Sequence, residues 1–103
     1  MKVLGAGPAA RADRPASALL HDEPNGRVVA FHLLPGQRIP PHHSDSTVIV
    51  QVVAGSGRFA GAESDALLSA GDCAVFAPGE THAIDAATEA LHFNVFITPR
   101  PEA

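Results

Sequence analysis

Short apolar runs separated by turn residues are the feature that most limits what this chain can fold into. The runs cover 27–34, 48–53, 57–60, 66–68, 73–76, 82–84 and 91–97. Between them lie segments that favour turns, among them Pro35-Gly36, Gly55-Ser56-Gly57 and Pro78-Gly79. This spacing predicts an antiparallel all-β domain. Residues 86–91 allow one helical turn, and no stretch is long enough to predict a longer helix.

Length and composition fit one small domain. The chain has 103 residues, of which 46% are hydrophobic and 17% charged, and this supplies enough apolar material for one core. Residues 1–16 have no hydrophobic period and include Pro8 and Pro15. We therefore expect an irregular or mobile leader over 1–16, with little part in function, followed by a barrel domain over 17–103.

Charge and residue types argue against two classes of partner. The formal net charge is -4 and the chain has no Trp or Tyr, so a phosphate-binding patch and a base-stacking platform are both missing from the pattern. No apolar run is long enough to span a bilayer or to act as a signal peptide. We expect no nucleic-acid partner, no membrane association and a cytoplasmic location. The single cysteine, Cys73, is expected to be buried in a strand.

Two segments that each place a histidine after a Pro-Gly turn carry the clearest chemical signal. Residues 35–57 contain Gly36, His42 and Gly55. They resemble the first cupin signature, in which a glycine, a His-x-His, a glutamate and a second glycine follow at set intervals. Residues 71–82, which end in His82, resemble the second signature. The chain is thus similar to small single-domain bacterial cupins, and this implies an RmlC-like jelly-roll barrel, or double-stranded β-helix.

The same resemblance supplies the candidate metal ligands. In metal-binding cupins, three histidines and a glutamate project into the barrel, and here only His42 and His82 match by position. Ser44 stands at the second histidine, Val48 at the glutamate and Ala86 at the asparagine of the second signature. The resemblance implies a divalent metal (Zn, Ni, Fe or Mn), while half of the usual ligand set is missing.

Strand geometry predicts a pocket around His42. Side chains two apart share a face, so an inward His42 brings Ser44, Val48 and Val50 with it. The inner wall would be mixed near the mouth and apolar deeper down, which is typical of small-molecule pockets.

Two further histidines are open alternatives. A bulge between residues 40 and 45 would turn His43 inward, because one extra residue exchanges the two faces of a strand. His43 is therefore the third candidate ligand. His92 shares a face with Asn94 and Phe96. The sequence leaves open whether that face lines the pocket.

Two functions follow from these residues. The first is binding of a small organic molecule in the barrel, with a divalent metal held by His42, His82 and His43. By resemblance, cupins with such metals include dioxygenases, isomerases and decarboxylases. The alternative is a metal-free ligand-binding or sensing module without catalysis. The retained histidines favour the first and the missing glutamate favours the second, so enzymatic activity stays open.

The pattern also predicts a homodimer. Residues 48–53 carry apolar side chains on both faces of the expected strand. Only one face can line the barrel, so the other needs a cover. A second copy of the chain would supply it.

Overall fold

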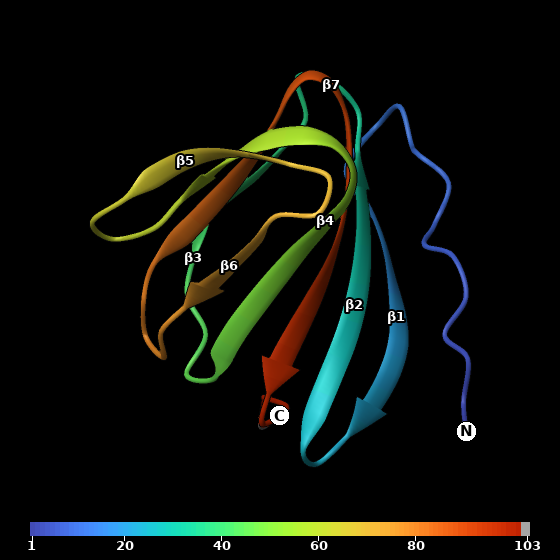
Figure 1. The fold of residues 1–103 in the computed structure, drawn as a ribbon, viewed down its shortest axis with the longest axis vertical. Helices are drawn as coiled ribbons and strands as arrows, with labels where there is room; N and C mark the ends of the chain where they lie inside the picture. Colours follow the sequence, from blue (N-terminus) through green and yellow to red (C-terminus); the bar gives the residue numbers. More distant parts are fainter. Residues whose placement is uncertain (102–103) are drawn as a thin grey trace.

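The structure is a computed structural model that describes residues 1–101, and its regular elements are all β-strands (Figure 1). The strands are β1 (Ala16–Glu23), β2 (Gly26–Leu33), β3 (Arg38–His42), β4 (Thr47–Ala60), β5 (Asp65–Ser69), β6 (Cys73–Phe76) and β7 (His82–Thr98). The all-β prediction is confirmed. Within residues 1–101 there is no helix with the length and hydropathy of a membrane span.

The strands form one antiparallel sheet that rolls up on itself. Its order is β1-β2-β7-β4-β5, with β3 paired to β7 and β6 paired to β4 off this path. The two long strands, β4 and β7, pair with each other from Thr47 opposite Thr98 to Ala60 opposite Ala83. One half of β7 also borders β2 and the other half borders β3. Because each long strand changes its second partner along its length, it takes part in both layers of the barrel (Figure 1).

The long strands bend where β4 contains Gly55 and Gly57. The β4–β7 register shifts on either side of Gly55, as β-bulges do. Gly55 has a φ of 78°, and a Cβ there would overlap the carbonyl oxygen of Ala90. We expected a turn at 55–57 and allowed a helical turn at 86–91, and both expectations are wrong. These residues lie within β4 and β7, although residues 87–90 of β7 have no register partner on β4, β2 or β3.

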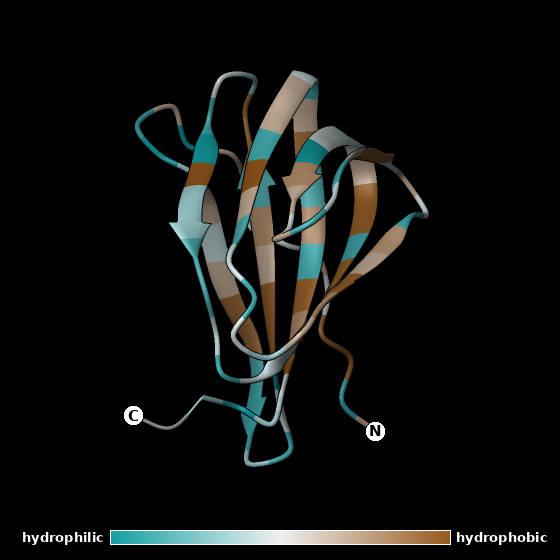
Figure 2. Ribbon diagram, turned by 90° about the vertical axis from the view of Figure 1, so that its left-hand side faces the viewer, coloured by the Kyte–Doolittle hydropathy of each residue, from teal (hydrophilic) through white to brown (hydrophobic). Residues whose placement is uncertain are grey.

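The core lies between the two layers on the inner face of the sheet. Its largest fully buried side chains are Leu33, Val50, Val52, Leu91 and Phe93. They alternate along their strands with side chains that face outward, as Figure 2 shows by the mixed hydropathy of each ribbon. Burial of each such side chain stabilises the fold by about 1.5–3 kcal/mol.

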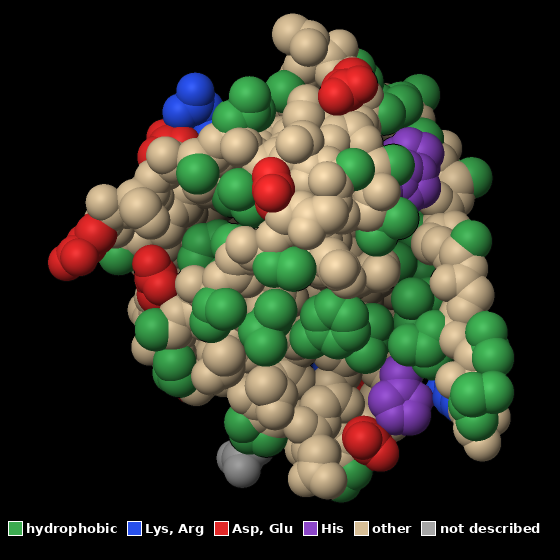
Figure 3. Space-filling view, in the orientation of Figure 1, with side chains coloured by type: hydrophobic (Ala, Val, Ile, Leu, Met, Phe, Trp, Pro, Cys, Tyr) green, Lys and Arg blue, Asp and Glu red, His purple; other side chains and the backbone are tan. Residues whose placement is uncertain are grey.

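The outer face carries an uninterrupted row of hydrophobic side chains. Val75, Ile49, Phe96 and Val28 stand opposite one another on β6, β4, β7 and β2. We call this row the outer apolar band. Figure 3 shows hydrophobic side chains crossing this face, with charged side chains around the band rather than within it. Val75 is 63% exposed.

Cys73 is exposed, so the prediction that it is buried is wrong. It lies on β6, which pairs only with β4 and forms an edge of the sheet. Ala74 and Phe76 pack against the core cluster, and Cys73 and Val75 alternate with them on the outer side. A short apolar run on an edge strand therefore does not imply burial of every member.

The leader lies against the sheet although it contains no strand before Ala16. The carbonyl oxygen of Pro8 is 3.2 Å from His32 Nδ1 on β2. Gln37 Nε2 donates a hydrogen bond of 2.6 Å to the carbonyl oxygen of Arg11. These contacts fix the leader to the outer side of the barrel.

The bend at Gly55 is the position where one added methyl should damage the fold most. We expect Gly55→Ala to lower the free energy of unfolding by more than about 3 kcal/mol, because the new Cβ would overlap Ala90. Gly36→Ala is the matched control, since Gly36 also has a positive φ of 87° but has nothing within 4 Å of the added Cβ. It should cost only about 1 kcal/mol. Urea unfolding of both variants measures the difference, and equal losses would contradict the steric explanation.

Candidate functional site

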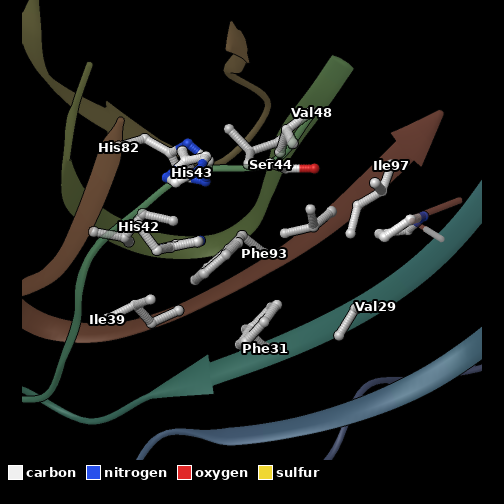
Figure 4. A pocket seen from close by; sticks show the side chains of 14 residues that line it. Val29, Phe31, Ile39, His42, His43, Ser44, Val48, His82, Phe93 and Ile97 are labelled. Atoms are coloured by element: carbon white, nitrogen blue, oxygen red, sulfur yellow. The ribbon is translucent and has the colours of Figure 1, made fainter. Parts of the chain in front are cut away.

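The inner face of the barrel encloses a cavity of about 250 Å³. Its walls are mostly apolar: Val29, Phe31, Ile39, Val48, Val50, Ile84, Phe93, Val95 and Ile97. The polar side chains in its lining are His42, His43, Ser44 and His82. Figure 4 shows the three histidines gathered at one end of the cavity, with Val29 and Ile97 towards the other end. The cavity is thus an apolar container with one polar end.

His42 and His82 meet because strands β3 and β7 place them opposite each other. His42 is the last residue of β3 and His82 the first of β7, and the two are register partners. Their ring centroids are 4.2 Å apart, with 67° between the ring planes. We expected these two residues to share a pocket, and both line the cavity.

Backbone carbonyl groups fix the orientation of both rings. His42 Nδ1 lies 3.0 Å from the carbonyl oxygen of Pro40, and His82 Nδ1 lies 3.1 Å from that of Glu80. A carbonyl oxygen can only accept, so Nδ1 carries the proton on each ring. When a ring is neutral, its Nε2 atom therefore keeps its lone pair for a ligand or a metal.

Burial keeps His82 neutral. The residue is 4% exposed, and the Phe76 ring stacks on the imidazole with 4.4 Å between centroids. This burial lowers the pKa of His82 below its ordinary value; the Glu80 carbonyl opposes the shift and His42 adds to it. A neutral imidazole at neutral pH is a hydrogen-bond acceptor through Nε2.

Glu80 holds the two loops that frame His82. Its carboxylate accepts hydrogen bonds of 3.0 Å from the Ala62 amide and 2.9 Å from the Ala77 amide. These two bonds lower the pKa of the Glu80 carboxyl. The residue stands in a turn and is more than a solvated charge, because it ties residues 61–64 to the segment that leads into β7.

His43 also lines the cavity, which resolves one of the open alternatives. The β3–β7 register is irregular between Ile39 and His42, where Pro40 and Pro41 lack the N–H groups needed for regular pairing. The strict alternation of faces ends there, and His42, His43 and Ser44 all contribute to the lining. His43 follows the end of β3 and lines the cavity together with His42, so it does not replace His42 in the way the bulge hypothesis supposed.

His92 lies on the opposite side of the sheet. Its ring contacts that of His32 at 3.6 Å between centroids, with 38° between the planes, and it is absent from the cavity lining. Its neighbour Phe93 faces the cavity instead, and alternation along β7 could have indicated this. Ile39 and Pro101 also line the cavity, and no pattern in the sequence marks them.

The donor set fits only part of a metal site. His42, Ser44, Val48 and His82 line one cavity, as the alignment with the cupin signatures implied. Serine and valine replace two of the four expected ligands. Within residues 1–101, no group of three or more His, Cys, Asp and Glu side chains is arranged to hold a metal ion. The described residues provide two oriented imidazoles and no complete ligand shell.

Comparisons with known proteins agree with this fold. The AraC-like ligand binding domain family model matches residues 26–101. The TT1209 protein of Thermus thermophilus superposes with a TM-score of 0.88 at 23% identity, covering 98% of each chain. An RmlC-like cupin family protein of Methanocaldococcus jannaschii, with a double-stranded β-helix fold, gives 0.79 at 17% identity, covering 98% of this chain and 95% of its own. No curated protein matches in sequence.

Proposed function

Because the chain belongs to the AraC-like ligand binding domain family and has the cupin fold, we propose that it binds a small organic molecule in its barrel without needing a metal. The observation that carries this proposal is the apolar cavity of about 250 Å³ with histidine acceptors at one end. A concave, mostly apolar pocket with a few convergent polar groups is the usual form of a small-molecule site.

The chemistry of the pocket defines the class of ligand. The walls contributed by residues such as Phe31, Phe93 and Val95 suit an apolar body, for example an aromatic ring or a branched chain. The Nε2 atoms of His42 and His82 accept hydrogen bonds, so the ligand should carry a donor such as a hydroxyl or a protonated amine. The proposed function is recognition of this donor in an apolar setting.

A second candidate is a divalent metal, Zn, Ni, Fe or Mn, held by His42, His82 and His43. The hydrogen bonds from Nδ1 of His42 and His82 to backbone carbonyl groups favour it. Metal-bound histidines are usually oriented in this way. When bound, such an ion would polarise an oxygen atom of the ligand. The incomplete ligand set makes this site weaker than that of a four-ligand cupin.

The outer apolar band supports a homodimer, which we also propose. The band joins β6, β4, β7 and β2 into one apolar surface. Two copies related by a two-fold axis would cover it with the same surface. A stable interface of this kind buries about 800 Å² on each partner.

The ligand proposal predicts that phenol binds more tightly than anisole, which lacks the hydroxyl proton. At about pH 8, the two Kd values should differ by about 2- to 10-fold, which corresponds to the net free energy of one hydrogen bond. NMR titration of the full chain measures both constants. In His42→Phe, which keeps an aromatic ring but removes the acceptor, the preference should fall.

Two neighbouring positions on β2 provide the control for this experiment. Val29→Phe fills the cavity and should weaken binding of both probes, whereas Val28→Phe adds the same bulk on the outer face and should not. Equal affinity for phenol and anisole, or equal weakening by the two substitutions, would contradict the proposed site.

The metal candidate predicts a gain of function in the double variant Ser44→His with Val48→Glu. Both positions line the cavity, so the new side chains would complete the shell begun by His42 and His82. Affinity for Ni²⁺ or Zn²⁺ should rise at least about tenfold, and the metal-free variant should melt at a lower temperature because a carboxylate replaces a buried valine. Added metal should restore the melting temperature. Calorimetric titration that finds no gain, or a gain that survives His82→Ala, would contradict this geometry.

The dimer proposal predicts that Val75→Lys separates the two copies. Val75 is 63% exposed on the outer apolar band, so the lysine should leave the monomer fold intact while placing a charge in the interface. Leu67→Lys on β5 is the matched control, because Leu67 is 66% exposed but lies outside the band. Equilibrium sedimentation should give a dimer for the parent protein and the control, and a monomer for Val75→Lys. A monomeric parent would refute the proposal.

A further inference from the structure

Residues 5–11 of the leader, which we call the strap, lie against the outer face of the sheet beside a pair of histidines whose rings are in contact. His32 on β2 and His92 on β7 are register partners, and their ring centroids are 3.6 Å apart with 38° between the planes. His32 Nδ1 donates to the carbonyl oxygen of Pro8, which holds the middle of the strap. Gln37 Nε2 holds its end through Arg11.

The strap closes over His92 at Gly7. A side chain added at Gly7 would meet the Cβ of Ala30 at 3.1 Å and lie 4.0 Å from His92 Nδ1. Beside this contact the strap and the sheet enclose a crevice of about 320 Å³. Phe31 and Phe93 line both this crevice and the barrel cavity, so the strap packs directly behind the wall of the ligand pocket.

Among residues 1–101, no acidic side chain pairs with either histidine, and the one hydrogen-bond partner of His32 is the Pro8 carbonyl. Two imidazolium ions at this separation would repel strongly. Uncharged side chains stand beside the pair on the neighbouring strands: Ala16 of β1, Ala30 of β2, and Val53 and Ala54 of β4. Glu89 of β7 is exposed, and on the strap Arg11 pairs with Asp13 at 3.0 Å.

We propose that the His32–His92 pair is an acid-sensitive latch for the strap. While at least one ring is neutral, the rings stay in contact and the strap stays closed over them. When both rings are protonated, repulsion separates them, the strap lifts from the sheet and the crevice behind the ligand pocket opens to water. The latch is independent of the ligand proposed for the barrel.

The direction of the pH response follows from the burial of His92. Burial under the strap lowers the pKa of His92 below its ordinary value, and the neighbouring His32 lowers it further. Lifting the strap returns His92 to water, where its pKa rises, so opening takes up a proton. The closed strap is therefore fully stable above the ordinary histidine pKa of about 6.5 and loses stability as the pH falls through the lowered value.

Backbone ¹⁵N relaxation of the full chain tests the latch without depending on a ligand. In the parent protein, the amides of Gly7 and Arg11 should have order parameters of about 0.85 at about pH 7.5 and below about 0.6 at about pH 5. In His92→Phe, which keeps an aromatic ring beside His32 but removes one charge, the strap should stay ordered at both pH values. His32→Gln keeps a donor for the Pro8 carbonyl and also removes one charge, so it should stay ordered as well, and it serves if His92→Phe does not fold.

His21→Gln is the matched control. His21 also lies on the outer side and contacts the leader, because Lys2 Nζ is 3.1 Å from His21 Nδ1. This variant should respond to pH like the parent protein. Three results would overturn the latch: a strap that stays ordered at about pH 5 in the parent, an equal loss of order in His92→Phe, or a response abolished by His21→Gln.

Discussion

The close approach of strands β4 and β7 at Gly55 and Gly57 is the constraint on which the rest of the structure depends. At Gly55 the backbone of Ala90 occupies the space where a side chain would stand, and at Gly57 the side chain of Leu91 and the backbone of Asp85 do. The pairing of the two longest strands shifts register here and resumes on the far side, so each strand belongs to both layers of the barrel. The cavity, the histidine end and the outer band are all arranged around these two bent strands.

Alternation along β7 gives adjacent residues different roles. Phe93 points into the cavity and packs against Phe31 and Phe59, while His92 points outward to His32 and the strap. Because a strand is only one residue thick, the ligand pocket and the proposed latch are separated by a single layer of backbone. A change in packing on either face of β7 therefore has a direct path to the other.

The sequence predicted the fold better than it predicted the site. Turn residues and two histidine segments were enough to predict the cupin barrel. The turn residues mark strand ends, and the histidine segments resemble the two cupin signatures. They could not show that Gly55 lies inside a strand, since only the partner strand reveals the crowding there. The prediction that Cys73 is buried was wrong for a related reason. An edge strand has one uncovered face, and which strands lie at an edge depends on the order of the strands in the sheet, which the sequence does not show. The sequence left open whether His43 lines the cavity, because that depends on the irregular segment around Pro40 and Pro41, and His43 does line it while remaining exposed.

The replacement of two expected ligands changes what the barrel can recognise without changing its shape. Val48 stands where the cupin signature has glutamate, and it is 4% exposed within the core cluster. A carboxylate at that depth would need a metal or another partner, whereas valine adds to the apolar wall. With the carboxylate gone, His42 and His82 keep their carbonyl-fixed orientation and present two acceptors to whatever fills the cavity. The same barrel positions that hold metal-ligating side chains around an ion can in this way hold an organic molecule by shape and by one or two hydrogen bonds.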